Sequence, residues 1–214
     1  MLHQYRREGQ ATVTQAEAAI SLCTEQGFAH YLAWGTIMRG WALTTLGRMV
    51  EGIALMRQGL AASQAVGAEL LLPYWLALLA ESCGKVGQVD EGLAVLAEAL
   101  ATAQRNGERL YEAELHRLKG ELLLALSPEN HAEAEACFHQ ALDVARRQQA
   151  KSLELRAAMS VSRLLRELGQ RDESHQILAE TYGWFTEGFA TADLMEAKVL
   201  LDEVSGVPIR PGQR

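Results

Sequence analysis

The sequence predicts an all-α fold, a right-handed superhelical array of about five antiparallel helical hairpins. Four copies of one pattern carry this prediction: a small residue, a bulky residue four positions later, and a second small residue three positions after that. The copies are Gly52/Met56/Gly59, Gly92/Leu96/Ala99, Ala134/Phe138/Ala141 and Ser174/Leu178/Thr181, so their first members are 40, 42 and 40 residues apart. A repeat of this length with helical spacing inside each copy is typical of stacked helical pairs.

Helical signals dominate between the turns, whereas strand signals are nearly absent. Alanine, leucine and methionine recur at steps of three and four residues in 52–61 and 91–101, and strong helix formers fill the remaining positions. Residues that favour strands nowhere alternate for long with polar residues. No strand is therefore expected.

The N-terminal stretch, residues 1–26, is expected to begin inside a hairpin. A fainter copy of the pattern, Ala16/Ile20/Cys23, lies 36 residues before the first clear copy. Gly9-Gln10 resembles the Gly-Gln pairs at 87 and 169, which predicts a turn there. The first helix would then be short and poorly capped, so we expect an upstream segment or a second copy of the chain, as a homodimer, to cover this end.

Glycines mark the expected turns, because glycine adopts positive φ at a helix C-terminus without a Cβ clash. The turns inside hairpins are expected at Gly47-Arg48, Gly87-Gln88 and Gly169-Gln170, and at 127–130 (Ser-Pro-Glu-Asn) in the longer third repeat. The breaks between hairpins are expected near Gly27, Gly67, Gly107 and Ala150.

A closing helix is expected over 191–204, where apolar residues recur at helical spacing. The last residues, 205–214, contain two prolines and two glycines and are expected to form a flexible tail. The predicted organisation is therefore one helical-repeat domain over 1–204 and a short tail.

The first helix of each hairpin carries its own small residue. It lies twelve positions before the second-helix mark at Gly40, Ala80 and Ser162, and fourteen positions before it at Gly120. Small residues at these places let two helices approach closely. The combined pattern resembles the tetratricopeptide repeat (TPR), slightly lengthened, over residues 28–187.

Four longer strings carry a narrower resemblance. They are 38–42 (MRGWA), 111–121 (YEAELHRLKGE), 141–148 (ALDVARRQ) and 182–189 (YGWFTEGF). Together they resemble the C-terminal repeat region of bacterial signalling proteins that join a class III adenylate or guanylate cyclase domain, an ATPase domain and TPR-like repeats. This resemblance implies a signalling context but no activity, because the chain has neither a cyclase domain nor a phosphate-binding Gly-x₄-Gly-Lys-Ser/Thr loop.

Composition disfavours several classes of protein. The net charge of −7 disfavours nucleic-acid binding, since phosphates are neutralised mainly by lysine and arginine. The apolar run at 70–80 contains Pro73 and is far shorter than the ~20 residues needed to cross a bilayer. Three cysteines and a polar N-terminus favour the reducing cytoplasm and no membrane partner.

No catalytic, cofactor or metal residue is predicted. Gly84-Lys85-Val86-Gly87 lacks the spacing of a phosphate loop and falls at an expected turn. The six histidines and three cysteines form neither His-x₃-His nor Cys-x₂-Cys, and Cys137 and His139 would point to different sides of a helix. A catalytic triad that assembles only in the fold stays open, but no nucleophile motif supports it.

The first helices of TPR-like hairpins line a concave groove, and one face of each predicted first helix carries recognition side chains. The candidate groove residues are Trp34, Trp41, Tyr74, Glu81, Glu114, Arg117, Glu121, Arg156, Arg163 and Arg166. Such a face suits an extended peptide or a partner helix. Two packing alternatives compete with this hypothesis: the tryptophans belong to the core, and the glutamate row at 114 and 121 pairs with the arginines at 156 and 163.

A basic segment from Arg146 to Arg171 has seven basic and two acidic residues. It is either a docking face for an acidic partner or nucleic acid, or a helical face that neighbouring acidic stretches neutralise. The second interpretation is favoured, because charged segments usually have this role.

The sequence thus favours a non-catalytic protein-interaction or regulatory module of a bacterial cyclase- or ATPase-bearing signalling system. A small-ligand sensor that binds an effector in the groove is the main alternative. An enzyme and a nucleic-acid adaptor are weaker alternatives.

Overall fold

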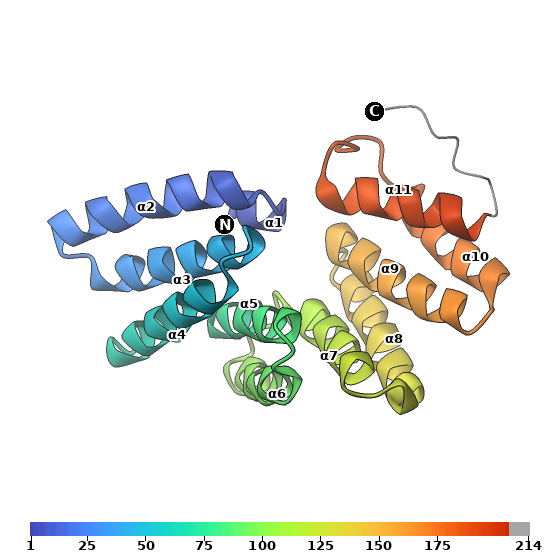
Figure 1. Ribbon diagram of the computed structural model, residues 1–214, viewed down its shortest axis with the longest axis horizontal. Helices are drawn as coiled ribbons and strands as arrows, with labels where there is room; N and C mark the ends of the chain where they lie inside the picture. Colours follow the sequence, from blue (N-terminus) through green and yellow to red (C-terminus); the bar gives the residue numbers. More distant parts are fainter. Residues whose placement is uncertain (206–214) are drawn as a thin grey trace. The chain divides into compact units, whose positions relative to one another are not determined.

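The computed structural model describes residues 1–205 (Figure 1). This part of the chain is all α-helical apart from its turns and one 3₁₀ turn, which confirms the predicted fold class. The elements are α1 Leu2–Tyr5, α2 Gly9–Gln26, α3 Ala29–Thr45, α4 Met49–Ala65, α5 Leu72–Lys85, α6 Val89–Asn106, α7 Glu112–Leu126, η1 Pro128–Asn130, α8 His131–Arg147, α9 Lys151–Glu167, α10 Arg171–Tyr182 and α11 Ala192–Val204. The predicted tail lies, from residue 206 on, outside the described residues.

The chain divides into two compact units, residues 1–111 (the N-terminal unit) and residues 112–214 (the C-terminal unit). The N-terminal unit holds the hairpins α1–α2, α3–α4 and α5–α6. The C-terminal unit holds α7–α8, α9–α10 and the closing helix α11, which packs on both α9 and α10. Each hairpin is a pair of antiparallel helices (Figure 1).

Left-handed backbone positions recur with the repeat. Between hairpins they fall at Gly27, Gly67, Gly107 and Gln149, with φ of 72°, 67°, 68° and 55°. Inside hairpins they fall at Arg7, Gly47, Gly87 and Gly169, with φ of 61°, 87°, 78° and 81°. The predicted breaks are therefore confirmed, including the one near Ala150.

The turn predicted at Gly9-Gln10 is wrong by two residues. The left-handed residue is Arg7, 40 positions before Gly47, and Gly9 is already the first residue of α2. Gly9 is small because its Cα faces α3: a Cβ there would lie 3.1 Å from Thr45 Cγ2. The glycine in this sequence pair marks helix packing rather than a turn.

The small residues of the repeat lie where two helices of a hairpin touch. A Cβ on Gly40 in α3 would lie 2.6 Å from the carbonyl oxygen of Gly52 in α4. In α9 and α10 the same role falls to two buried serines, and Ser174 Oγ donates to the carbonyl oxygen of Ser162 at 2.8 Å. The packing reason inferred from the sequence is confirmed at both hairpins.

Each unit has its own core. Trp75, Tyr74, Ile37 and Met56 are fully buried in the N-terminal unit. In the C-terminal unit, the fully buried side chains include Phe138, Leu115, Leu142, Leu155, Leu164 and Leu178. No helix within residues 1–205 is long and apolar enough to cross a membrane.

Candidate functional site

The candidate groove residues occupy equivalent positions of successive first helices. Trp34, Tyr74, Glu114 and Arg156 are separated by 40, 40 and 42 residues and lie on α3, α5, α7 and α9. The same steps separate Trp41, Glu81, Glu121 and Arg163. Residues 34, 41, 74 and 81 belong to the N-terminal unit, and the others belong to the C-terminal unit.

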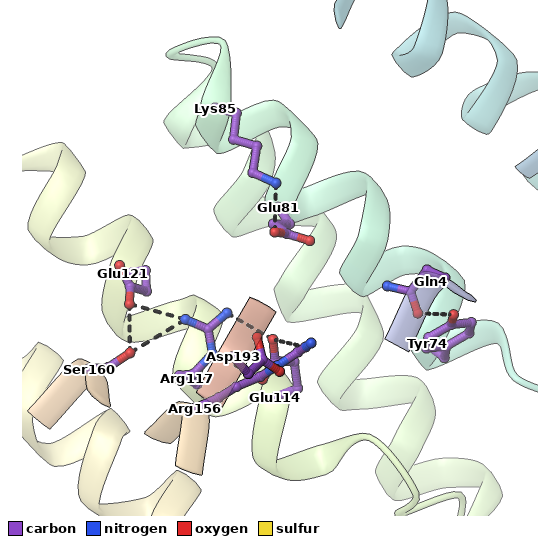
Figure 2. A network of polar contacts seen from close by, with 10 residues as sticks. All are labelled: Gln4, Tyr74, Glu81, Lys85, Glu114, Arg117, Glu121, Arg156, Ser160 and Asp193. Carbon is purple, nitrogen blue, oxygen red and sulfur yellow. Dashed lines mark hydrogen bonds and ion pairs between the residues drawn. The ribbon is translucent and has the colours of Figure 1, made fainter. Parts of the chain in front are cut away.

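The aromatic candidates in the N-terminal unit lie mostly in the core. Trp41 is 3% exposed and Tyr74 is fully buried, whereas Trp34 is partly exposed. Tyr74 Oη donates to Gln4 Oε1 at 2.6 Å, so the short helix α1 covers this tyrosine (Figure 2). Tyr5 of α1 also packs on the Tyr74 ring, with centroids 5.7 Å apart.

These placements differ from the groove hypothesis at Trp41 and Tyr74. The physical reason is size: a large apolar ring gains more from burial than it would at a solvent-exposed face. Trp41 therefore follows the core alternative, and a peptide could reach Tyr74 only after α1 moved. Ligand contact at Trp34 and at the half-buried Glu81, which pairs with Lys85 at 2.7 Å (Figure 2), stays a prediction.

A buried ionic cluster joins α7, α9 and α11 in the C-terminal unit. Glu114 is 3% exposed and accepts two hydrogen bonds from Arg117, at 2.8 Å from Nη2 and 3.0 Å from Nε. Arg156 Nη1 lies 3.4 Å from the same carboxylate and Arg156 Nε donates to Asp193 at 2.8 Å. Glu114 lies on α7, Arg156 on α9 and Asp193 on α11, which are alternate helices along the chain. The sign of the charge therefore changes from each of these helices to the next.

The titration of Glu114 reflects this pairing. Burial alone raises the pKa of the Glu114 carboxyl, but the guanidinium groups of Arg117 and Arg156 outweigh burial and lower this pKa to about 2. Burial lowers the pKa of Arg117, and the carboxylate of Glu114 more than restores it, so the net shift is upward. Both groups are therefore charged throughout the neutral range.

Arg117 also joins the buried cluster to the surface. Its Nη1 donates to Glu121 Oε1 at 3.1 Å, and Ser160 Oγ on α9 donates to the same oxygen at 2.6 Å (Figure 2). The Glu121 side chain remains 40% exposed. The ladder alternative is thus seen for Glu114 and Arg156, whereas Glu121 reaches α9 through Ser160.

The closing helix α11 supplies carboxylates to the arginines of α9. Arg163 donates to Glu196 at 2.6 Å and Arg166 donates to Glu203. Both arginine side chains are 34% exposed, and the two carboxylates are 41% and 39% exposed. We call Glu121, Arg163, Arg166, Glu196 and Glu203 the charged row.

Sequence reasoning predicted Glu121, Arg163 and Arg166 of this row but missed Glu196 and Glu203. A partial signal was present, since Glu203 follows Arg166 by 37 residues, a few residues less than the repeat length of 40–42, whereas Glu196 follows Arg163 by only 33 residues. The closing helix packs on α9, and its carboxylates pair with the arginines of α9.

The basic segment is neutralised by neighbouring carboxylates. At its start, Arg146 and Lys151 both pair with the buried Glu154, at 3.1 and 2.7 Å. Its other arginines on α9 pair with Glu114 and with α11, as described above. The ion pairs of Arg146, Lys151 and the α9 arginines agree with the second interpretation, in which neighbouring carboxylates neutralise the segment.

The histidine, cysteine and acidic side chains of residues 1–205 do not cluster as metal ligands. No group of three or more histidine, cysteine or acidic side chains there could hold a metal ion. The three cysteines are buried thiols, and burial raises the pKa of Cys83 and Cys137, which disfavours their reactive thiolate forms. Gly87 of the Gly84–Gly87 segment is the left-handed residue that ends α5.

The comparisons with known proteins show the fold. No family model matches the chain. The structure of BtubC (BKLC) from P. vanneervenii is similar with a TM-score of 0.68 and 14% identity, covering 96% of this chain and 95% of BtubC. A putative kinesin light chain from Podosopora anserina, with nearly identical TPR-like repeats, is similar with a TM-score of 0.59 and 16% identity over 85% of this chain and 89% of the other.

Two further proteins are also similar to this chain. The apo form of RapI is similar with a TM-score of 0.61 and 12% identity, covering 95% of this chain and 59% of RapI. An uncharacterized protein from Rhizobium meliloti (strain 1021), R02095, is 30% identical over 133 residues. That match covers 62% of this chain but 12% of the relative's length. The fold is TPR-like, as the repeat pattern predicted.

Proposed function

We propose that this chain is a non-catalytic protein-interaction module that binds a protein segment through the charged row of its C-terminal unit. The observation that carries this proposal is the contrast between two layers of charge. Glu114 and Arg117, which form the inner layer, are at least 86% buried as side chains, whereas Arg163 and Glu196 in the outer layer are 34% and 41% exposed.

The two layers differ in the free energy that is lost when an ion pair breaks so that its side chains can bind a partner. Breaking a buried ion pair costs roughly 3–5 kcal/mol, because it leaves an uncompensated charge in the interior. An exposed pair contributes only about 0–1 kcal/mol, so its partners can turn to a new ligand at small cost. The buried cluster therefore fixes the helices, while the charged row offers both signs of charge to a partner with complementary side chains.

The resemblance to repeat regions of cyclase- and ATPase-bearing signalling proteins suggests the partner. We propose that the chain acts in regulation next to such domains, in the same polypeptide or as a free-standing subunit. The match to R02095 covers only 12% of that protein's length. This supports the proposal that such a module can be part of a larger protein.

Isothermal titration with purified cyclase and ATPase domains from the genome that encodes this chain tests the proposal. We expect one of them to bind, and expect a double variant, Arg163→Gln with Arg166→Gln, to weaken binding about tenfold or more. Arg171→Gln on the exposed start of α10 is the matched control and should leave affinity unchanged. The proposal fails when neither domain binds, or when the control variant weakens binding as much as the double variant.

A second candidate function, sensing of a small ligand, is favoured by a cavity in the N-terminal unit. The cavity has a volume of about 220 Å³ and is lined by side chains of α2, α3 and α5, together with residues 1 and 3. A sensor would couple its occupation to partner binding. Repeating the titration with and without a cavity ligand tests this function, which fails when the two affinities are equal.

A further inference from the structure

The first hairpin has a short first helix. The first helices α3, α5, α7 and α9 have 14 to 17 residues, whereas α1 has four. The turn after α1 is nevertheless that of the other hairpins: Glu8 N–H donates to the carbonyl oxygen of His3, and the equivalent hydrogen bond closes the turn after α3. The helix α1 therefore corresponds to the last turn of a first helix, and most of α2 has no hairpin partner within residues 1–205.

A half-open groove lies where such a partner would pack. On the α2 side it is lined by Thr12, Ala16 and Ala19. The residues 40 positions later in α4 form the repeat pattern and pack against the first helix α3. The groove has a volume of about 220 Å³, and an engineered apolar cavity of about 150 Å³ is large enough for benzene, so one large side chain fits.

Side chains that later hairpins cover are uncovered at this groove. Tyr31 of α3 is 57% exposed, whereas Tyr111, two repeats later, is 5% exposed. Trp34 is partly exposed, whereas its equivalent in α5, Tyr74, is fully buried. Ala19 is also partly exposed, whereas the equivalent small residues of α4, α6 and α8 are buried. The strip left uncovered on α2 and α3 is therefore the one that a full first helix would bury.

A helix in the groove would continue an interface that the chain already has. Met1 and His3 also line the groove, so the packing of α1 on α2 runs directly into it. A helix that follows the direction of α1 would end beside Met1, whose N-terminal amine is partly buried. The partial negative charge at a helix C-terminus complements the positive charge of this amine.

A second copy of the chain has no free helix to donate within its described residues. Each of the helices α2 to α11 already packs against another helix of its own unit. Releasing one of them would break a hairpin or uncover the closing face of α9. The helix that fits the groove therefore comes from a different protein.

The size of Ala16 sets what this helix carries. At the equivalent place of α8 the residue is Phe138, and it packs so closely that a Cβ on Gly120 of α7 would lie 2.4 Å from Phe138 Cε1. The large residue of that hairpin is on the second helix and the small one is on the first helix. Because α2 has the small residue instead, its partner has room for a large one.

We propose that the groove between α2 and α3 binds an amphipathic α-helix of a partner protein, with a large apolar side chain seated against Ala16. The helix takes the place of a full first helix, and Tyr31 and Trp34 pack along its other side. This inference concerns the N-terminal unit alone and does not depend on the charged row. It gives the cavity a different occupant from the small ligand of the second candidate function.

Peptides copied from α7 are suitable probes, because residues 112–126 form a complete first helix. Gly120→Ala and Gly120→Leu give two peptides of similar helix propensity that differ in size at the decisive place. A lactam bridge between Glu112 and a lysine at 116 (His116→Lys) holds both helical, and both keep a free C-terminal carboxylate. Binding to the full chain is measured by fluorescence anisotropy. We expect the Gly120→Leu peptide to bind about tenfold or more tightly, because its larger side chain is buried.

Variants of the protein locate the bound peptide. Ala16→Met gives α2 the bulky residue that α4 has at this place, so it should remove the preference for the Gly120→Leu peptide. Ala18→Met, on the exposed side of α2, is the matched control and should leave the preference unchanged. The indole N–H resonance of Trp34 should shift in ¹⁵N NMR on binding, whereas that of Trp184 in the C-terminal unit should not. Thermal unfolding establishes that each variant is folded.

Four results would overturn the inference. They are no binding of the Gly120→Leu peptide, equal affinities of the two peptides, an equal loss of preference in Ala18→Met, and a shift at Trp184 alone. A chain that is a dimer in light scattering and a monomer as Ala16→Met would also overturn it, because the groove would then hold a second copy. None of these results bears on binding through the charged row, which is measured with a different partner and different variants.

Discussion

Replacing Glu114 by glutamine tests the energetics of the buried cluster most sharply. The substitution keeps the size of the side chain but removes its charge, so Arg117 and Arg156 lose their shared carboxylate. The pKa of Glu114 is about 2 in the fold against an ordinary value of 4.5. At 1.36 kcal/mol for each pKa unit, the ionised carboxylate stabilises the fold by about 3 kcal/mol at neutral pH.

The sign of the pH dependence follows from the lowered pKa. The stabilisation is fully present above pH 4.5 and is lost as the pH falls from 4.5 towards 2, because the unfolded chain takes up the proton first. We therefore expect Glu114→Gln to lower the free energy of unfolding by about 3 kcal/mol at pH 7. The difference between this variant and the unaltered protein should shrink towards zero near pH 2.

Urea unfolding followed by far-UV circular dichroism measures the loss in free energy of unfolding at pH 7 and its decrease at lower pH. Glu81→Gln is the control, because Glu81 occupies the position in α5 that Glu121 has in α7 and forms a half-exposed pair with Lys85. An exposed pair contributes less than about 1 kcal/mol. A loss below 1 kcal/mol in Glu114→Gln at pH 7, or a difference that does not change between pH 7 and pH 3, would refute this account of the cluster.

Two further predictions concern the repeat itself and are measured by thermal and urea unfolding. Gly40→Ala should destabilise the N-terminal unit by about 2 kcal/mol or more, since its Cβ would lie 2.6 Å from the backbone oxygen of Gly52. Gly27→Ala is the control, because Gly27 has φ of 72° but no atom lies within 4 Å of a Cβ built there. This variant should lower the free energy of unfolding by only about 1 kcal/mol. Equal losses in the two variants would contradict the packing argument. Gln149→Gly should stabilise the C-terminal unit by about 0.5–1 kcal/mol, because φ is 55° at this residue. The same change at Gln148, where φ is −82°, should destabilise it, and stabilisation there would contradict the conformational reason.

The fold was readable from the sequence because its determinants are local and repeated. Glycines at a constant step fix the turns, and small residues at a constant step fix the close approach of paired helices. Arg7 shows the limit of this reasoning: it takes the left-handed position that glycine has in later repeats, so the sequence drew attention to Gly9 instead. A rule based on residue type fails where the fold holds another residue in the same conformation.

The candidate site was readable only in part. Helical spacing predicted that the candidates on each first helix share one face, but it carries no information on what covers that face. Tyr74 is hidden because Gln4 and Tyr5 of α1 lie on it, and that contact spans about 70 residues of sequence.

The central claim is that the first-helix face of the C-terminal unit binds a protein partner. Photo-crosslinking tests it most directly, with benzoylphenylalanine placed singly at Glu121 or Arg163, and at Gln140 or Arg171 on the exposed faces of second helices. Each protein is irradiated with the purified cyclase and ATPase domains. The account predicts adducts with one of these domains from Glu121 and Arg163, and none from Gln140 or Arg171. Adducts from the second helices alone, or from no position, would contradict it.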